Sequence, residues 1–161
     1  MTINEYNRCV DDFSDAIYRF LLKNSRNVEV ARDLVQDSFL KLWIKRKGVE
    51  FAKSKSYLFT TAYHTLIDHT RKLEYRQTDY NIDLDNSTTE HGYSDLKEIL
   101  DFAVDKLPAI QRSVVLLRDY EGYSYKEIGE ITELTEAQVK VYIYRARLFL
   151  KKFIGSPEMV I

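Results

Sequence analysis

The sequence predicts an all-α protein made of two small helical domains, and three observations predict this fold class. Apolar residues recur three or four positions apart through most of the 161 residues, which is the spacing of one helix face. No stretch alternates apolar and polar residues as a strand does, and only five glycines and two prolines are present. A polar, acidic stretch near the middle lacks the helical spacing, so the predicted helices fall into two groups.

The first group, residues 1–77, contains three predicted helices. The first is expected from about 4 to 23, where bulky apolar residues recur at helical spacing. Asn27 belongs to a residue type that caps helices, and Gly48 can end the second helix after three basic residues that suit a helix C-terminus. A short loop leads to a third helix from about 56 to 76. We therefore expect a three-helix first domain.

We interpret residues 78–94 as a linker between the two domains. Residues 79–95 contain five acidic residues and no Lys or Arg, whereas residues 1–78 contain 14 basic and 10 acidic residues, a net charge of +4. The overall charge of −1 therefore hides a basic domain followed by an acidic linker.

The second group, residues 95–161, contains four predicted helices. The first follows the linker, and Pro108 is suited to begin the second, which Gly122 can end. Two short sequences then match the capping box, in which a Ser or Thr and a Glu or Gln three residues later satisfy each other's backbone N–H groups. They begin at Ser124 and Thr135, only eleven residues apart. Two capped helices joined so tightly predict a helix-turn-helix.

The last predicted helix has an apolar side and a basic, aromatic side. Its apolar stripe consists of Val139, Ile143, Ala146 and Leu150, which must pack on the preceding helices. The neighbouring stripe consists of Lys140, Tyr144, Arg147 and Lys151. Residues 137–152 contain five basic residues and no acidic residue.

Such a helix fits the major groove of B-DNA, where Lys and Arg reach guanine and phosphates and Gln can read adenine. We expect residues 135–145 to approach base edges and the later cations to contact the backbone. The alternative is a solvated basic helix, because the helix dipole alone favours cations near a C-terminus by about 0.3–1 kcal/mol each. Gly129 favours the first interpretation slightly, since a helical glycine costs about 1 kcal/mol unless close packing requires it.

These residues resemble those of a known family. Residues 107–152 resemble region 4 of the extracytoplasmic-function sigma factors, whose pattern is matched by Leu107-Pro108, Arg112, Gly122, Ser124-Tyr125, Glu127-Ile128, Val139-Lys140 and Arg145-Ala146-Arg147. The sequence ARDLVQDSFLKLW is similar to region 2.2 of that family, and YLFTTAYHTLIDHTRK to its regions 2.3 and 2.4. The motifs cover nearly the whole chain in the right order.

The resemblance implies an RNA polymerase specificity subunit that directs the core enzyme to a class of promoters. The implied partners are promoter DNA and the core enzyme, through its β′ clamp helices and β flap. A third implied partner is an anti-sigma factor, often membrane-anchored in this family. By position, the residues at the clamp interface are Asp33, Gln36, Asp37, Lys41 and Trp43. Trp43 fits a core position equally well.

The resemblance also implies two DNA-binding surfaces. Capture of the melted minus-10 element needs aromatic rings and cations, for which the chain offers Phe51, Lys53, Lys55, Tyr57, Tyr63, His64, Arg71 and Lys72. Tyr57 and Tyr63 are also suited to fill the helical core. The minus-35 duplex maps onto Arg118, Ser124, Thr135, Ala137, Gln138, Lys140, Val141, Tyr144, Arg145 and Arg147.

The chain departs from the family pattern at three places. The family usually has Asn where His64 stands, and its helix-turn-helix often has Gly where Glu133 stands. If Glu133 needs a positive φ, its backbone is strained by about 1 kcal/mol or more. The loop VEFAKSKS is shorter than in many relatives, which bears on the choice of flipped base.

Two other kinds of protein are alternatives to a sigma factor. One is a dimeric helix-turn-helix regulator that binds operators without polymerase, and the other is a protein-interaction adaptor with no DNA role. We expect no enzymatic activity, no small-molecule substrate and no cofactor, since no phosphate loop or catalytic constellation is present. His64 and Asp68 share a helix face, but no third ligand follows, so we expect no metal site.

The same composition limits the compartment. Cys9 is the single cysteine, which excludes an internal disulfide or a cysteine-paired zinc site and suits a reducing compartment. No apolar run approaches the roughly 18 residues needed to span a bilayer, and the first residues are too polar for a signal peptide. We therefore expect a cytoplasmic protein.

Overall fold

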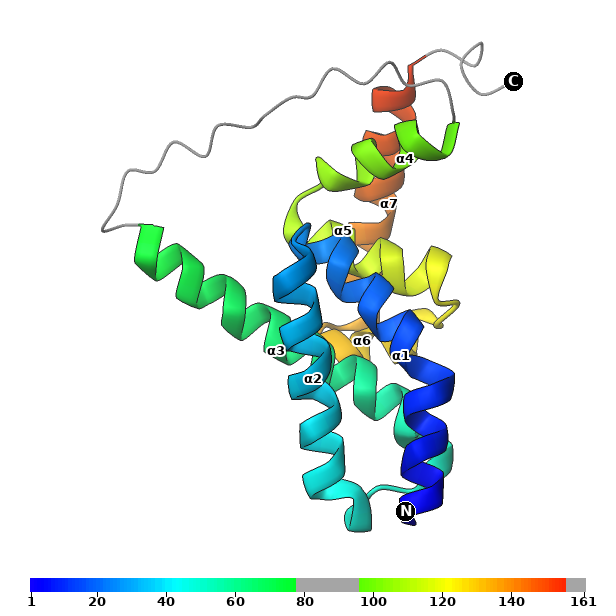
Figure 1. Ribbon diagram of the computed structural model, residues 1–161. Coiled ribbons are helices and arrows are strands. Elements are labelled where there is room, and N and C mark those ends of the chain that lie inside the picture. The colour runs from blue at the N-terminus through cyan, green and yellow to red at the C-terminus, as the bar shows by residue number, and fades with distance from the viewer. Residues whose placement is uncertain (78–95, 156–161) are drawn as a thin grey trace.

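The computed structural model describes residues 1–77 and 96–155 of the chain. These residues form seven α-helices and no β-strand, which confirms the predicted all-α class (Figure 1). The predicted linker, residues 78–94, lies outside the described residues. Among the described helices, none is both long and apolar enough to cross a membrane.

Three helices form what we call the N-terminal unit: α1 (Ile3–Ser25), α2 (Val28–Lys45) and α3 (Ser54–Gln77). A capping box of Thr2 and Glu5 begins α1. The predicted cap of α2 is confirmed, since the side chain of Asn27 accepts a hydrogen bond from the Val30 N–H. The buried residues of α1 and α2 are mainly large aliphatic and aromatic side chains, which pack these two helices together and onto α3.

Four helices form the C-terminal unit: α4 (Leu96–Asp105), α5 (Ala109–Val115), α6 (Tyr125–Thr132) and α7 (Glu136–Ile154). The helix predicted from Pro108 to Gly122 has two parts, because a π-helical turn, Leu116–Tyr120, continues α5. Gly122 ends this turn with φ 75°, a conformation that glycine adopts without steric cost.

The helix-turn-helix is formed by α6 and α7. Both predicted capping boxes are present, at Ser124 and at Thr135. A Cβ atom added to Gly129 would lie 2.7 Å from the backbone oxygen of Leu134. The close approach of the turn therefore explains the helical glycine, as the sequence predicted.

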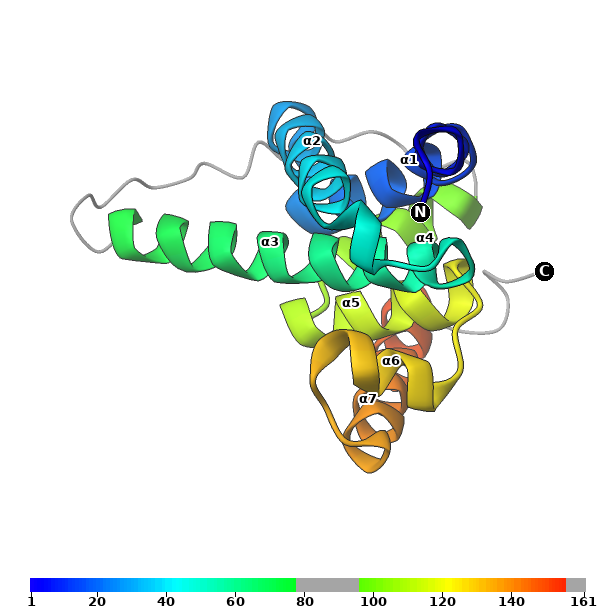
Figure 2. The ribbon, with the colours of Figure 1, turned by 90° about the horizontal axis from the view of Figure 1, so that it is seen from below.

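The two units pack into one body, with α3 in the middle. Seen from below, α1 and α2 lie on one side of α3, and α5, α6 and α7 lie on the other (Figure 2). A continuous cluster of buried apolar side chains runs through both units. Within it, the ring of Phe59 on α3 meets Phe20 of α1 and Tyr123 of the C-terminal unit, with ring centres 5.6 and 5.4 Å apart. The limits of two independent domains, 1–77 and 95–161, stay a prediction.

Candidate nucleic-acid interface

Helix α7 has the two faces that its sequence predicts. Val139, Ile143 and Ala146 are 0–2% exposed, and Leu150 is half-buried against the same core. The outward residues of its first three turns, all on the minus-35 list, are exposed: Ala137, Gln138, Lys140, Val141, Tyr144 and Arg145. Tyr144 is 68% and Val141 45% exposed, so an aromatic and an apolar side chain lie beside the cations on this face.

The capping box restricts how Gln138 can read a base. Its side-chain oxygen accepts a hydrogen bond from the Thr135 N–H at 2.9 Å, while the Thr135 hydroxyl accepts from the Gln138 N–H at 3.1 Å. The oxygen of the Gln138 amide is therefore engaged, so its NH₂ group alone faces outward as a donor. A two-bond contact with adenine needs both groups, so the capping box has to open for that contact.

A ring that the sequence reasoning did not assign organises the cations beside α7. The side chain of Tyr125, at the start of α6, lies between Arg118 and Lys140, whose charged groups are 4.6 and 5.8 Å from its centre. Arg118 also donates a hydrogen bond to the Tyr123 carbonyl at 2.9 Å. Two cations on one ring present positive charge at the N-terminal end of the helix-turn-helix.

Two other residues of the minus-35 list are already engaged within the C-terminal unit. The Arg147 guanidinium donates to the Asp119 carboxylate at 2.7 Å, and the Ser124 hydroxyl accepts a hydrogen bond as the cap of α6. Arg147 is exposed, whereas Ser124 is half-buried. Their availability to a phosphate therefore depends on exchanging an existing partner.

The residues of the minus-10 list do not form one surface. Lys55, Tyr63, His64 and Arg71 lie where α3 faces the C-terminal unit. Burial raises the pKa of Tyr63, and the nearby Glu133 carboxylate raises it further. Lys72 is exposed on the outer end of α3.

Three others lie elsewhere on the N-terminal unit. Phe51 packs beneath the guanidinium of Arg8, 4.8 Å from the ring centre, and Lys53 approaches Glu50 at 3.8 Å. Tyr57 is half-buried on α3 and faces α2. The predicted set is therefore divided between two sides of α3.

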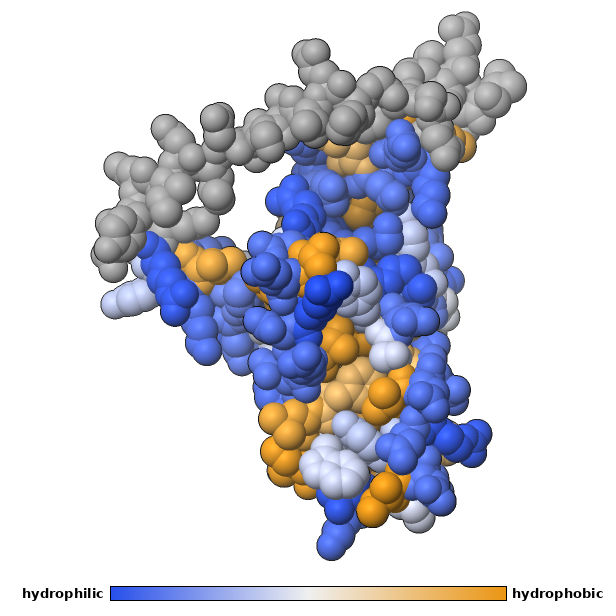
Figure 3. All heavy atoms as spheres, viewed as in Figure 1, coloured by the Kyte–Doolittle hydropathy of each residue, from blue (hydrophilic) through white to orange (hydrophobic). Residues whose placement is uncertain are grey.

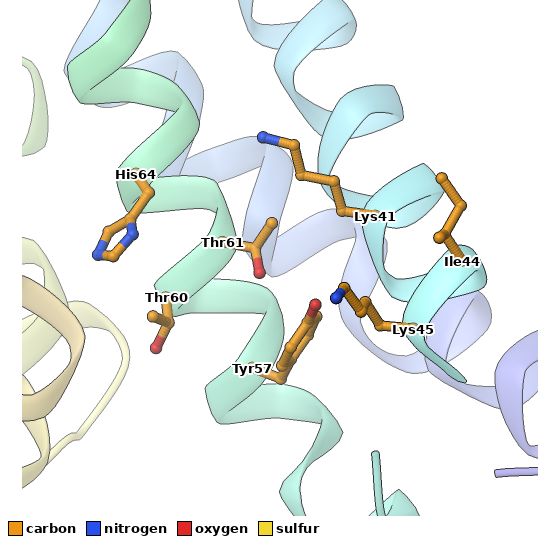
Figure 4. A pocket seen from close by; sticks show the side chains of 7 residues that line it. All are labelled: Lys41, Ile44, Lys45, Tyr57, Thr60, Thr61 and His64. Carbon is orange, nitrogen blue, oxygen red and sulfur yellow. The ribbon is translucent and has the colours of Figure 1, made fainter. Parts of the chain in front are cut away.

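A pocket of about 430 Å³ lies between α2 and α3 beside Tyr57. Figure 4 shows Lys41 and Lys45 on α2 extending toward α3, where Tyr57 and Thr61 face them. Ile44, Thr60 and His64 complete the lining. An aromatic ring, hydroxyls and two cations are the groups that an unstacked base and its phosphate require. The sequence did not assign Lys45 to DNA binding, because the helix dipole already explains a cation at the C-terminal end of α2.

The outer face of α2 carries the residues assigned to core polymerase. Asp33, Gln36, Asp37 and Lys41 are exposed there. Trp43 differs from them, because it is half-buried against Tyr6 and Arg46. Its ring centre lies 4.9 Å from the centre of the Tyr6 ring and 3.8 Å from the guanidinium carbon of Arg46.

The sequence reasoning missed two apolar residues on this face. Leu40 and Ile44 are 55% and 66% exposed, one helical turn apart. Figure 3 shows apolar side chains gathered over the lower part of α2. The signal was present in the sequence, since the apolar residues of α2 extend beyond one helix face.

The predicted strain at the turn is present. Glu133 has φ 60° and ψ 34°, the left-handed conformation that glycine usually occupies. Its carboxylate lies 3.7 Å from His64 Nε2, so the two departures from the family pattern face each other. Among the described residues, no three His, Cys, Asp or Glu side chains are grouped so as to hold a metal ion.

Comparison with known proteins gives consistent matches over this whole arrangement. A model for sigma-70 region 2 matches residues 9–76, and one for sigma-70 region 4 matches residues 97–150. The ECF RNA polymerase sigma factor SigM of Bacillus subtilis is 30% identical over 158 residues, which cover 94% of each chain. The RNA polymerase sigma factor YlaC of that organism is 31% identical over 147 residues, 84% of each chain.

A solved structure matches both units together. The sigma factor RpoE of Bartonella quintana, in complex with the anti-sigma factor NepR, superposes with a TM-score of 0.82. The two sequences are 25% identical, and the match covers 94% of this chain and 98% of the other.

Proposed function

This chain belongs to the extracytoplasmic-function RNA polymerase sigma factors of the sigma-70 family, and we propose that it recognises promoters through α7 and through the α2–α3 region. As a sigma factor it acts with core polymerase and promoter DNA. The outer face of α7 reads the minus-35 duplex, while α3 and the pocket beside it capture melted minus-10 DNA. We expect no catalytic step of its own.

One observation supports this proposal most directly. A single helix, α7, is fixed to the protein by an apolar stripe that is buried at Val139, Ile143 and Ala146. The same helix exposes Lys140, Tyr144 and Arg145 to solvent. A solvated basic helix needs no exposed Tyr and Val beside its cations. A helix held rigidly from behind, with donors and apolar groups outward, suits a major groove.

The minus-10 function is supported by the pocket of Lys41, Lys45, Tyr57 and His64. Its volume accommodates one unstacked base, with the Tyr57 ring as a stacking surface and the lysines near the phosphates. His64, where relatives often carry Asn, lies at the edge of this pocket and presents a ring in place of an amide.

The polymerase contact is proposed on the outer face of α2. Asp33, Gln36 and Asp37 supply polar contacts to the β′ clamp helices, while Leu40 and Ile44 supply exposed apolar area. The C-terminal unit would meet the β flap. The RpoE structure contains an anti-sigma factor, and we propose that this chain is also controlled by such a partner, which can be membrane-anchored.

The dimeric regulator is not favoured, because the relatives match along both units and are sigma factors. Transcription in vitro with core polymerase tests the proposal. Lys140→Glu should lower transcription from cognate promoters by about 10- to 100-fold while core binding in a pull-down is retained. Ile44→Asp should lose core binding, and transcription with it, while it keeps the weak binding of minus-35 duplex.

Lys106→Glu is the matched control, since it reverses an exposed charge on the C-terminal unit that lies near the last turn of α7 and not beside Lys140. Loss of core binding by Lys140→Glu would mean that the two surfaces are assigned wrongly. Binding of an operator duplex as a dimer without polymerase would favour the regulator.

A further inference from the structure

The helix that is proposed to enter the major groove begins with an exposed carboxylate. Glu136 is the first residue of α7, and its side chain is 54% exposed. It is the only acidic residue between Thr135 and Lys152, a stretch that contains five basic residues. Double-stranded DNA carries a negative charge about every 1.7 Å along its axis. A carboxylate at this position therefore opposes binding to DNA unless it meets a hydrogen-bond donor there.

Helix capping does not explain this carboxylate. In α1 and α6 the acidic residue of the first turn, Glu5 or Glu127, closes the capping box. In α7 the neutral Gln138 takes that place, so Glu136 lies outside the capping box. The helix dipole favours any acid in the first turn, but this effect does not distinguish one DNA sequence from another.

Glu136 lies in line with two groups of the proposed minus-35 surface. Its carboxylate oxygen is 3.7 Å from Lys140 Nζ, one turn further along α7. Tyr144, one turn beyond Lys140, is exposed on the same stripe. An acceptor, a cation and an aromatic ring therefore follow one another along the helix. The acceptor stands at the N-terminal end, which contacts base edges in helix-turn-helix proteins.

The other outward side chains of the first two turns are apolar or act as donors. Ala137 and Val141 are apolar, and Lys140 only donates. The amide oxygen of Gln138 already accepts a backbone N–H of the capping box at 2.9 Å, which leaves its NH₂ group to donate. Donors select the acceptor atoms of guanine or thymine. Among these side chains, the Glu136 carboxylate is the one that can select an amino group.

The chemistry of the base edges indicates cytosine as the target. In the major groove cytosine presents its N4 amino group, from which a Glu or Asp carboxylate accepts. Adenine also presents an amino group, but its N7 acceptor lies beside that group and repels a carboxylate. Guanine and thymine present acceptors, which repel it as well. Lys140 lies about 6 Å further along the helix axis, so it can reach a guanine within about two base pairs of that cytosine.

We propose that Glu136 is a specificity-determining residue of the minus-35 surface, and that its carboxylate accepts a hydrogen bond from the N4 amino group of a cytosine. This inference rests on the proposed recognition of duplex DNA by α7. Contact with the cytosine compensates for the repulsion between the carboxylate and the phosphates, whereas other duplexes meet the repulsion alone. Glu136 therefore lowers the affinity for unrelated DNA and raises discrimination at one base pair.

Selection from a duplex library tests this inference. The full-length chain is bound at low salt to duplexes with a randomised central region, and the bound fraction is sequenced. For the wild-type chain we expect one position at which cytosine is preferred over each other base by about tenfold. Glu136→Ala should remove this preference and keep those at other positions. It should also bind unselected duplex roughly threefold more tightly, because it removes a negative charge.

A change of preferred base is the sharper result. Glu136→Gln keeps the size of the side chain, and Gln matches the donor and acceptor atoms of adenine. The preferred base at that position should therefore change from cytosine to adenine. A residue that only stabilises the helix cannot produce this change, since it affects all duplexes alike. Glu130→Ala, on the exposed side of α6, is the matched control and should leave every base preference unchanged.

Lys140→Glu separates this inference from the proposed function. Loss of sequence selection in that variant supports recognition of DNA by α7. If both Glu136 variants nevertheless keep every base preference of the wild-type chain, the role of Glu136 is overturned and the proposed function stands. Uniformly weaker binding with unchanged preferences overturns it too, because that result assigns Glu136 to helix stability. Full selection by Lys140→Glu would overturn the recognition of DNA by α7, and this inference with it.

Discussion

Helices α7 and α3 are both assigned to DNA, but the structure treats them differently. α7 lies at the edge of the molecule, with one buried stripe and one exposed face. α3 lies between two layers of helices, so side chains such as Phe59 and Tyr63 are buried on the side that meets the C-terminal unit. Whether a helix face is available to a ligand depends on what packs against it. The sequence of the helix alone does not show this.

The two helices therefore differ in how available their assigned faces are to DNA. The exposed face of α7 is ready to bind, and its affinity depends on its own side chains. The face of α3 that meets the C-terminal unit is covered by packed side chains, so its availability depends on that packing as well as on its own residues. Substitutions that act on only one helix test this distinction.

The largest effect is expected at Phe59, on the doubly packed helix. Its ring is fully buried between Phe20 and Tyr123, so Phe59→Ala should lower the free energy of unfolding by about 3–5 kcal/mol. Chemical denaturation followed by circular dichroism measures this change. Lys72→Ala, on the exposed end of the same helix, should stay within about 0.5 kcal/mol. An equally small effect at Phe59 would mean that α3 is not packed on both sides.

Two adjacent residues of α7 have different roles, since Ile143 packs in the core and Tyr144 faces outward. Ile143→Ala should cost about 2–4 kcal/mol of stability, because Ile143 is 2% exposed in the core. Tyr144→Ala should leave stability within about 0.5 kcal/mol and weaken duplex binding. Thermal unfolding and fluorescence anisotropy on minus-35 duplex measure the two properties. The same loss of stability in both variants would contradict the two-faced helix.

The fold was largely predictable from the sequence because its signals are local. Capping boxes at Ser124 and Thr135, the Asn27 cap and the glycine at 129 each depend on residues within a few positions. The packing of α1 and α3 against the C-terminal unit was not predicted. It depends on contacts such as Asn24 with Ser113, whose 89-residue separation leaves no periodic signal.

The candidate site was predictable to a different degree on each helix. On α7, one stripe is apolar and the neighbouring one is basic, so its outer residues could be named. On α3, apolar residues surround more of the helix, and the sequence left open whether Tyr57 and Tyr63 face the core or DNA. The structure separates them: Tyr63 is buried where α3 meets the C-terminal unit, while Tyr57 lines an open pocket.

A smaller effect is expected at Tyr125, which supports the open face. Its ring holds Arg118 and Lys140, and cation–π contacts at exposed sites are worth about 0.5–1 kcal/mol each. Loss of both contacts in Tyr125→Leu should therefore weaken binding of minus-35 duplex by about five- to thirtyfold, whereas Tyr125→Phe retains the ring and most of the affinity. Anisotropy titrations at fixed salt measure both. Equal losses in the two variants would assign the effect to the hydroxyl.

The smallest effect concerns Tyr123, on the covered side of the comparison. Burial raises the pKa of Tyr123 to about 12, with Glu121 and Glu127 adding to the shift. Because the unfolded chain loses this proton near pH 10, the contribution to stability is complete below pH 10 and is lost as pH rises toward 12. Tyr123→Phe removes the ionisable group together with the unsatisfied hydroxyl, so it should be equally stable or more stable by up to about 1 kcal/mol at pH 8.

Denaturation at pH 8 to 11 compares the two proteins, and the stability advantage of Tyr123→Phe should grow above pH 10. The difference between the proteins is the informative quantity, since other tyrosines and lysines ionise in both. If water reaches the Tyr123 hydroxyl in solution, its pKa stays near the usual value of a tyrosine, so the two curves run parallel. A difference that grows with pH would show that the packing of Tyr123 against Phe59 of α3 keeps its hydroxyl neutral.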